Sequence, residues 1–577
     1  MPFDTKVAAR SRTSPTSPFA IFDRTVHGSI AELTSAMSPV VAAQAWLDWY
    51  AHLSISPGKQ VELLMQASDE TLRLASRILV DHTPTQQQKD RRLDRRFEAD
   101  DWKAWPFNVL HLAHLASERW WQNATSGIRG VSRRSEMLVR FGAQQSLHAL
   151  SPANFLATNP ELWRATFEQG GRNLLRGARN LATDIFHAAT GNRPVDEEFV
   201  VGKNLALTPG RVIFRNQLVE LIQYEPTTPT TRPEPVLIVP AWIMKYYILD
   251  LQPHNSMIKF LVDHGHTVFA ISWRNPTAEH RDLGMDDYLQ SGVMAALDVI
   301  SRLMPNRKVH ACGYCLGGTM LSIAAAAMAR DGDDRLASVT MLAAQTDFTE
   351  PGEIALFIDD TAIAWLDGAM ALWGFLDGSR MGGSFQMLRV DDLIWKPFVR
   401  RYVLGETDRP NDLMSWNADQ TRMPYRMHTE YLRNLYLHNQ IAQGRFVVAN
   451  RPIALSDIEV PIYCLGTAQD HVAPWRSVFK LHLLARSDLT FVLTSGGHNA
   501  GVISEPGHPG RTYQKLVRPH DGRYVDPDTW VSTASHHEGS WWVDWGRWLD
   551  DHSGELIAPP SLADAVCTAP GAYVLER

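Results

Sequence analysis

The chain has 577 residues, of which 45% are hydrophobic and 21% are charged, so it can bury a large core and is expected to form at least two domains. Its net charge of −7, with Lys and Arg scattered along the chain, excludes the basic surplus typical of a nucleic-acid-binding protein. The sequence contains neither the roughly 20 apolar residues that cross a bilayer nor a secretory signal, and its four cysteines are too few for a disulfide framework, so we predict a cytoplasmic protein.

The first part of the chain is predicted to be helical. Residues 1–30 are rich in Ser, Thr and Pro and are expected to form a flexible segment. Residues 31–195 carry apolar side chains at spacings of three and four, as in ETLRLASRILVDH, together with the Ser, Asn and Pro residues typical of helix starts. We therefore predict a mainly helical N-terminal domain over 31–195, which ends where GNRPVDEEF breaks the pattern.

Residues 196–577 have the alternating pattern of a parallel α/β sheet. Strand-length apolar runs, such as EPVLIVPA, HTVFAISW, KVHACG and SVTMLAA, are separated by helical stretches. The alternation stops at about 349–455, where a long, aromatic, partly helical insertion precedes the next core strand, VPIYCLG. An insertion of this size predicts a cap or lid on the catalytic domain.

The stretch KVHACGYCLGGTML, residues 308–321, has two readings. As strand, tight turn and helix, it is the nucleophile elbow of an α/β-hydrolase fold, with Cys315 in the place usually taken by serine and glycines on either side that avoid steric clashes. As Cys-x-x-Cys, it pairs Cys312 with Cys315 in a redox dithiol. Its position deep in a long α/β domain favours the elbow, in which Cys312 is a buried residue of a core strand. No second ligand pair supports zinc, and we expect no metal and no cofactor.

A nucleophile elbow needs an acid and a base further along the chain. Asp470 follows the strand VPIYCLG and His498 follows the strand LTFVLTSG, so both are expected at the carboxyl end of the sheet, beside Cys315. His471 and His508 are the other candidates for the base. We prefer His498 because a strand and two glycines directly precede it.

Acyl transfer also needs two amide donors for the oxyanion. The first is expected to be the amide of Leu316, directly after the nucleophile. The second is expected in the loop that follows PVLIVPA, at either Trp242 or Ile243.

Motifs spread over most of the chain point to one family. The stretches PAWIMKYYILDLQPHNSMIKFLVDHGHTVFAISWRNP, GYCLGGT, FQMLRVDDLIW, DHVAPW, SGGHNAGV and GSWWVDWGRWL resemble the successive signatures of polyhydroxyalkanoate synthases. DRRFEADDWKAWPF and SPANFLATNPEL resemble the N-terminal domain of that family, so the similarity runs from about residue 90 to the end of the chain. The chain most resembles the full-length, single-subunit class I enzymes, which use short-chain substrates, although the same motifs occur in the medium-chain type.

The resemblance implies an acyltransferase that polymerises (R)-3-hydroxyacyl-CoA into a polyester and releases CoA. It implies Cys315 as the acyl-accepting nucleophile, His498 as the base and Asp470 as the third member of the triad. It also implies a product held in cytoplasmic granules, with the granule surface, granule-associated proteins and a second copy of the chain as partners. Cysteine suits this reaction because exchanging one thioester for another keeps the acyl group activated.

The insertion supplies further candidate residues. Those predicted to line an acyl channel or to form a dimer contact are Trp416, Tyr425 and Tyr431. His471 is expected to line the site. Two other functions stay open: an esterase, thioesterase or polyester-degrading hydrolase on the same fold, and a non-catalytic granule-surface protein that attaches through Trp102, Trp105 and Phe107.

Overall fold

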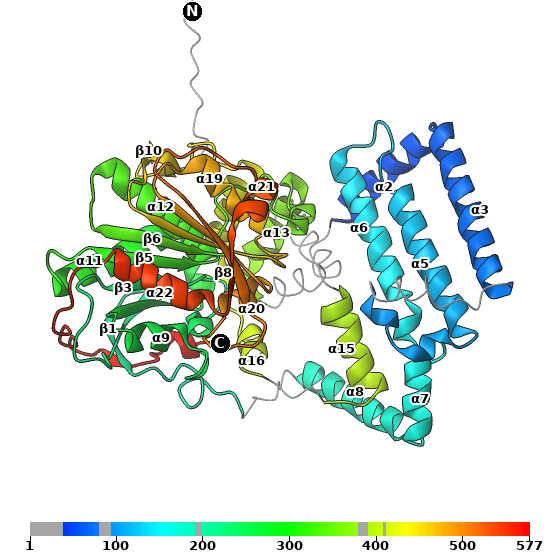
Figure 1. Cartoon of the computed structure of the whole chain (residues 1–577), viewed down its shortest axis with the longest axis horizontal. Helices are drawn as coiled ribbons and strands as arrows, with labels where there is room; N and C mark the ends of the chain where they lie inside the picture. The colour runs from blue at the N-terminus through cyan, green and yellow to red at the C-terminus, as the bar shows by residue number, and fades with distance from the viewer. Residues whose placement is uncertain (1–37, 80–93, 191–197, 379–389, 408–410) are drawn as a thin grey trace, which may run out of the picture.

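The computed structural model describes residues 38–79, 94–190, 198–378, 390–407 and 411–577. It contains a large sheet flanked by helices and, beside it, a group of helices formed by the N-terminal part of the chain (Figure 1). The segment 1–30, predicted to be flexible, lies outside these ranges. None of the helices within them is long and apolar enough to cross a membrane.

The N-terminal part is helical, as the sequence pattern predicts. Its α-helices are α2 (Pro39–Ser54), α3 (Pro57–Leu79), α5 (Phe107–Ala124), α6 (Arg133–Ala149), α7 (Pro160–Glu168) and α8 (Arg172–Thr190). Over the described residues from 38 to 190 there is no strand. The helix-start signal in SPANFLATNPEL is realised at Asn159, whose side chain accepts hydrogen bonds from the backbone N–H groups of Glu161 and Leu162 at the start of α7.

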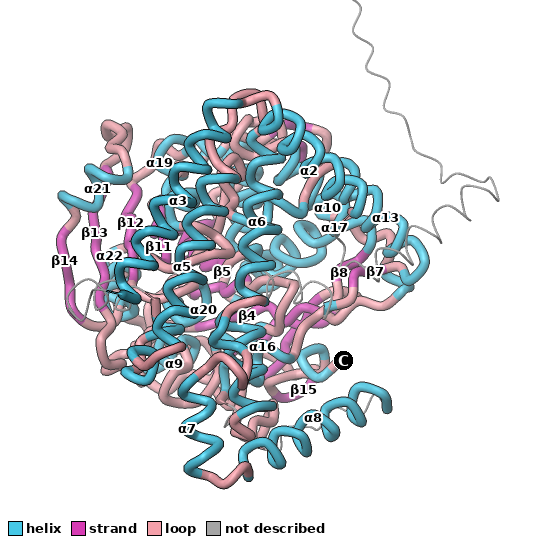
Figure 2. Tube along the Cα trace, turned by 90° about the vertical axis from the view of Figure 1, so that its right-hand side faces the viewer, coloured by secondary structure: helices cyan, strands magenta, loops and turns pink. Residues whose placement is uncertain are grey.

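The main sheet has eleven strands in the order β14-β13-β12-β11-β6-β5-β3-β4-β2-β1-β15. The strands β4, β3, β5, β6, β11 and β12 are parallel, and antiparallel strands extend the sheet at both ends. Figure 2 shows β14, β13, β12 and β11 side by side. The bounds are β1 (Gly210–Arg215), β2 (Val219–Tyr224), β3 (Val236–Val239), β4 (Val268–Trp273), β5 (Val309–Tyr314), β6 (Leu336–Leu342), β11 (Ile462–Thr467), β12 (Leu489–Thr494), β13 (Thr512–Arg518), β14 (Ser535–Glu538) and β15 (Cys567–Thr568).

Helices cover both faces of this sheet. The helices nearest to it are α9 (Met257–Asp263), α10 (Met285–Tyr288), α11 (Ala295–Leu303), α12 (Leu316–Asp331), α18 (Trp475–Phe479), α19 (Leu481–Leu484), α20 (His498–Val502), α21 (Pro527–Thr533) and α22 (Trp541–Asp551). Along β5, Val309 and Ala311 belong to the same apolar cluster as α12, whereas Cys312 and Tyr314 belong to the cluster of α9 and α22. Because side chains alternate along a strand, each face of β5 contributes to a different core.

The segment between β6 and β11 interrupts the alternation of strand and helix. Its described elements are α13 (Asp360–Trp373), α15 (Lys396–Phe398), α16 (Asp412–Ala418), α17 (Tyr425–Tyr431), the π-helical turns η8 (Asp391–Trp395), η9 (Val399–Val403) and η10 (Leu432–Leu437), and the short strand pairs β7 (Phe375–Leu376) with β8 (Met423–Pro424) and β9 (Val447–Val448) with β10 (Arg451–Pro452). We call residues 349–455 the insertion.

The insertion also contacts the N-terminal helices. Figure 1 shows α15 beside α8. The amide groups of Asn173 and Asn180, on α8, donate hydrogen bonds to the carbonyl oxygens of Val403 (3.1 Å) and Arg401 (3.0 Å). The Arg401 guanidinium forms an ion pair with Asp184 at 2.6 Å. The two parts are therefore joined by hydrogen bonds and by charge.

Candidate active site

Cys315 lies in a strained turn between β5 and α12. Its backbone has φ +52° and ψ −123°, a conformation that residues with a side chain rarely adopt. The turn is held by hydrogen bonds from the Cys315 N–H to the Leu342 carbonyl (2.9 Å) and from the Gly318 and Thr319 N–H groups to the Cys315 carbonyl. This is the geometry of a nucleophile elbow, which raises the thiol above the end of the sheet.

Two glycines let α12 approach the sheet at this turn. A β-carbon at Gly317 would collide with the carbonyl oxygens of Val239 and Pro240, at the end of β3. A β-carbon at Gly313 would collide with the backbone of Gly318. Neither position has room for a side chain. The motif Gly-x-Cys-x-Gly is therefore required by the close contact of α12 with β3 and β5.

Asp470 and His498 meet at the same edge of the sheet. Asp470 lies in the loop after β11, and His498 is the first residue of α20, after β12. The Asp470 Oδ2 atom is 2.8 Å from His498 Nδ1 and accepts a hydrogen bond from Thr467 Oγ1 at 2.7 Å. Backbone N–H groups of Val472 and Ala473 donate to Oδ1, each at 2.8 Å. The carboxylate is thus fixed by its own loop and directed at the imidazole.

Charges within the site oppose the effect of burial. Burial lowers the pKa of His498, but the charges of Asp470 and Cys315, and hydrogen bonds with both, raise it well above its usual value of 6.5. Burial raises the pKa of Asp470, whereas the charge of His498 and hydrogen bonds from His498, Ala473 and Thr467 lower it below its usual range. His498 therefore interacts with both Asp470 and Cys315, and its environment favours the protonated imidazole.

Aromatic side chains fix the position of His498. The Tyr314 ring stacks on the imidazole with centroids 5.5 Å apart, and its hydroxyl donates to Asn499 Oδ1 at 2.6 Å. The indole N–H groups of Trp541 and Trp542 donate to the carbonyls of Gly501 and Val502, in α20, at 3.0 and 2.9 Å. The first two tryptophans of GSWWVDWGRWL are thus core residues of α22 that hold the helix carrying His498. This contact was not predicted from the sequence.

The alternative histidines have other surroundings. His471 directly follows Asp470 and is half-buried. His508 is also half-buried, and its ring nitrogens contact the Pro509 carbonyl and Arg511. Of these histidines, the structure brings His498 together with Cys315 and Asp470.

The loop after β3 is tied to the insertion. The Thr421 hydroxyl donates to the Trp242 carbonyl at 2.7 Å, and the Thr421 N–H donates to the Ile243 carbonyl at 3.3 Å. Leu316 is the first residue of α12, where backbone N–H groups have no partner within the helix. The predicted oxyanion residues therefore lie on the two sides of the close contact between β3 and the elbow.

Aromatic residues of the insertion have different roles. Trp416 is buried and donates from Nε1 to the Lys245 carbonyl at 2.7 Å. Tyr425 lies under the Arg281 guanidinium, 5.9 Å from its ring centroid. The buried Tyr431 donates its hydroxyl proton to Tyr436 Oη at 3.2 Å. Tyr436, five residues after Tyr431, was not among the residues predicted from the sequence.

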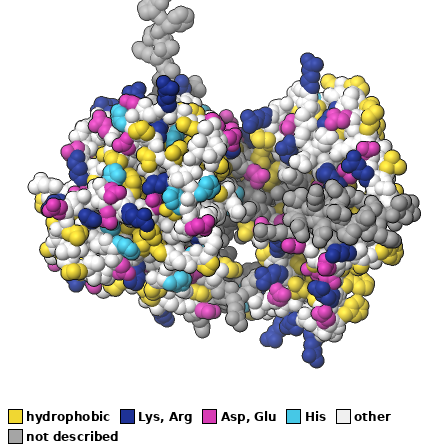
Figure 3. All heavy atoms as spheres, in the orientation of Figure 1, with side chains coloured by type: hydrophobic (Ala, Val, Ile, Leu, Met, Phe, Trp, Pro, Cys, Tyr) yellow, Lys and Arg dark blue, Asp and Glu magenta, His cyan; other side chains and the backbone are white. Residues whose placement is uncertain are grey.

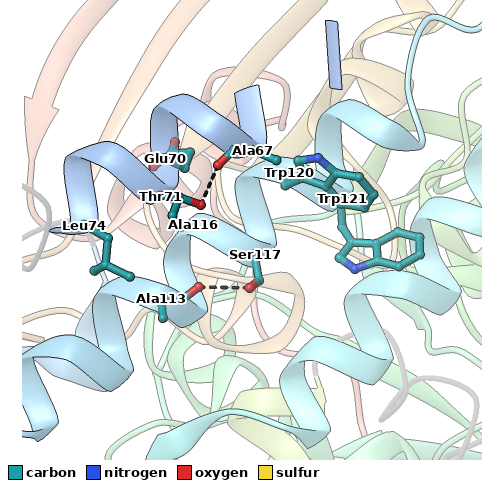
Figure 4. Close-up of a pocket in the computed structure, with 9 residues that line it drawn as sticks. All are labelled: Ala67, Glu70, Thr71, Leu74, Ala113, Ala116, Ser117, Trp120 and Trp121. Atoms are coloured by element: carbon teal, nitrogen blue, oxygen red, sulfur yellow. Dashed lines mark hydrogen bonds between the residues drawn. The ribbon is translucent and has the colours of Figure 1, made fainter. Parts of the chain in front are cut away.

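Other residues singled out in the sequence have different surroundings. Cys312 is buried, which raises its pKa, and all four cysteines are free. Trp102 is also buried, with Nε1 bonded to Glu161 at 3.0 Å, so its ring has no surface to offer a granule, whereas Trp105 is 76% exposed. A groove of about 300 Å³ between α3 and α5, lined by Leu74 and Trp120 among others (Figure 4), belongs to the N-terminal helices.

Three family models match parts of the chain. A family model described as "Poly-beta-hydroxybutyrate polymerase (PhaC) N-terminus" matches residues 93–261, one described as "Poly-beta-hydroxybutyrate polymerase N terminal" matches residues 17–59, and the model "alpha/beta hydrolase fold" matches residues 234–502. The large mixed sheet with its flanking helices is accordingly an α/β-hydrolase fold, as predicted. Among solved structures, a Paleococcus ferrophilus monoacylglycerol lipase is 15% identical, with a TM-score of 0.32, and the match covers 59% of this chain and all of that chain.

Curated relatives match over most of their length. A poly(3-hydroxyalkanoate) polymerase of Methylorubrum extorquens is 42% identical, over 83% of this chain and 80% of the relative. A poly(3-hydroxyalkanoate) polymerase subunit of Rhizobium etli is 40% identical, over 86% and 78%. The corresponding subunit of Cupriavidus necator is 36% identical, over 84% and 83%.

Proposed function

The chain belongs to the poly(3-hydroxyalkanoate) polymerase family, a family of acyltransferases, and from this premise we propose that it polymerises (R)-3-hydroxyacyl-CoA with release of CoA, through a covalent acyl-thioester on Cys315. The observation that carries the proposal is the thiol on a nucleophile elbow next to an imidazole that is itself bonded to a buried carboxylate. Such an arrangement is suited to nucleophilic acyl transfer.

In the first step, the Cys315 thiol proton moves to His498. Nδ1 of His498 is engaged by Asp470, so Nε2 is the atom left for the thiol. The thiolate attacks the carbonyl carbon of the substrate thioester, and the amide of Leu316 and an amide of the loop at Trp242 and Ile243 stabilise the oxyanion. The tetrahedral intermediate then collapses, the bond to the CoA sulfur breaks, and CoA leaves with the proton held by His498.

In the second step, the 3-hydroxyl of another substrate lengthens the chain. His498 takes the hydroxyl proton, and the oxygen attacks the thioester carbonyl on Cys315 to form an ester bond. The bond to the Cys315 sulfur breaks, and the thiolate recovers the proton from His498. Asp470 stabilises the imidazolium in both steps but keeps its own charge.

The insertion is proposed to act as a cap that keeps water from the acyl-enzyme. Its contacts with the catalytic part support this role, since Thr421 bonds the loop after β3 and the charge of Cys315 reaches Tyr431. On this basis we propose residues 31–195 as the helical domain and residues 196–577 as the catalytic domain, with 349–455 as the cap.

Association with cytoplasmic polyester granules, and with granule-associated proteins, is part of the proposal. The N-terminal helices expose large apolar side chains (Figure 3), among them Leu47, Leu64 and Met65 at 67% each. Such a surface favours contact with an apolar polymer or another protein. We also propose a homodimer, for which the mass in solution, measured with and without substrate, is the test.

The proposed reaction is tested by assaying CoA release from (R)-3-hydroxybutyryl-CoA and sedimentable polyester in the same tube. Wild type is expected to give both products, and Cys315→Ala neither. Cys312→Ala is the matched control, because it removes a buried thiol from the same motif and is expected to keep activity. CoA release with free hydroxy acid in place of polymer would instead establish a hydrolase, and an active Cys315→Ala variant would refute the nucleophile.

A further inference from the structure

Two tyrosines of the insertion form a hydroxyl pair that the proposed mechanism does not use. Tyr431 ends α17, and Tyr436 lies in the π-helical turn η10 that continues it. In an ordinary α-helix residues five apart point in different directions, since each residue turns the chain by about 100°, but a π-turn is wider and brings such residues closer. The ring centroids are 5.4 Å apart at 82°, and the hydroxyl oxygens are 3.2 Å apart.

The tyrosine pair lies near the end of the sheet at which Cys315 is placed. The Tyr436 ring packs on Phe348, with centroids 4.8 Å apart, and Phe348 belongs to the loop after β6, the neighbour of β5. That loop is bonded to the elbow helix by the Thr319 hydroxyl, which donates to the Gln345 carbonyl at 2.8 Å. Tyr436 and Cys315 pack against the same apolar cluster.

Charge interactions agree with this placement. Burial raises the pKa of both tyrosines, and the charge of Cys315 raises them further, that of Tyr436 to about 12. A charge acts on both hydroxyls only if they lie near it in a medium of low polarity. Both tyrosines therefore stay protonated and able to donate a hydrogen bond near Cys315.

One donor of the pair is left over. Tyr431 donates a hydrogen bond to Tyr436 Oη. The Tyr436 oxygen is thus an acceptor, and the hydroxyl proton of Tyr436 is not used in this hydrogen bond. Among the described residues, no acceptor receives that proton. A hydroxyl donor that packs against an apolar cluster is costly to leave unpaired, and it favours a ligand with an oxygen acceptor at that place.

We propose that the Tyr436 hydroxyl donates a hydrogen bond to the 3-hydroxyl oxygen of the substrate acyl group at Cys315, and thereby selects 3-hydroxyacyl thioesters over unsubstituted acyl thioesters. The inference rests on the proposed function of the site. This hydroxyl belongs to the acyl group on Cys315, so it is not the hydroxyl of the incoming substrate from which His498 takes a proton. Tyr431 is a positioning residue, since its hydrogen bond turns the Tyr436 proton toward the substrate.

The test compares two thioesters that differ only in the hydroxyl. CoA release is measured with (R)-3-hydroxybutyryl-CoA and with butyryl-CoA, the latter as a single turnover that acylates Cys315, for wild type and variants. In Tyr436→Phe, the preference for the hydroxy substrate is expected to fall about tenfold, the equivalent of one hydrogen bond, with the butyryl-CoA rate unchanged. Tyr431→Phe is expected to lower the preference by a smaller factor.

Tyr402→Phe is the matched control. It removes a hydroxyl from the same insertion, but one that is bonded to Asp184 at 2.8 Å on α8, so the preference is expected to stay at the wild-type value. An unchanged preference in folded Tyr436→Phe, or an equal loss with both thioesters, would overturn the inference. Failure of the proposed function is distinguishable: wild type would then hydrolyse the thioesters without making polymer, and the same ratio would still decide the role of Tyr436.

Discussion

Asp470→Asn is the substitution that tests the coupling within the triad most directly. The side chain keeps its shape, and its oxygen can still accept the N–H groups of Val472 and Ala473. The new amide group replaces Oδ2, which contacts Thr467 and His498 Nδ1. An amide donates to Nδ1 where a carboxylate accepts from it, so the imidazole proton moves to Nε2, the atom that must take the thiol proton.

The size of the effect follows from the contact that is lost. A hydrogen bond to a charged group contributes about 1.5–3 kcal/mol, and each 1.4 kcal/mol is about a factor of ten. Without it, protonated His498 loses stability relative to the neutral ring, and the thiolate population of Cys315 falls about 10–100-fold near neutral pH. Together with the changed tautomer, we expect kcat to fall about 10²–10³-fold. This loss is smaller than the roughly 10⁴-fold loss in a serine triad, since a thiol ionises more easily.

The assay is the rate of Cys315 alkylation by iodoacetamide across pH, read by mass spectrometry of the peptide that carries Cys315. In Asp470→Asn, the rate is expected to rise at higher pH than in wild type and to reach a similar limit. Asp544→Asn is the control, because Asp544 is a buried carboxylate of the same domain that pairs with Lys515. Coincident profiles for wild type and Asp470→Asn would refute the coupling.

Three further predictions concern stability and the loop after β3. Gly317→Ala is expected to lower the free energy of unfolding in urea by about 3 kcal/mol, because there is no room for a β-carbon at this site. Gly142→Ala is the control, because a β-carbon there would meet open space. A Gly317→Ala variant as stable as the wild type would contradict the prediction. Thr421→Val leaves a loop carbonyl unbonded, so kcat should fall about tenfold; an unchanged kcat would show that the hydrogen bond does not position the loop. Burial lowers the pKa of His266 to about 4 and of His310 to about 3, so the unfolded state takes up more protons than the folded state below pH 6.5. Urea titrations should therefore show the free energy of unfolding falling as the pH drops from about 6.5 to 3, and falling less steeply in His310→Gln.

Much of the site could be predicted because its signals are local. The elbow needs a strand, a tight turn with glycines on either side of the nucleophile, and a helix. The sequence of residues 308–321 predicts all three. The order of acid and histidine follows from where successive parallel strands end, and the structure brings Asp470 and His498 into contact at that edge. The chemical roles of Cys315, Asp470 and His498 stay predictions.

The rest depends on contacts between distant residues. The hydrogen bonds of Thr421 to the loop after β3 join residues about 180 positions apart. No sequence pattern in either segment predicts this contact. Tyr436 was missed because the usual helical period separates residues five apart, whereas a π-turn unites them. The hydrogen bond from the Trp416 indole to the Lys245 carbonyl also joins distant residues, 171 positions apart. The prediction that Trp416 lines an acyl channel or forms a dimer contact stays a prediction.

The packing of α8 against the insertion sets an order of events during protein synthesis. α8 ends at residue 190 and its partner begins at residue 396, so a ribosome adding about 5–20 residues per second reaches the partner about 10–40 s later. During that time, Asn173 and Asn180 lack the carbonyl groups that they bond in the finished protein. The N-terminal half of the nascent chain therefore completes its folding only after β5, β6 and the nucleophile elbow have been translated.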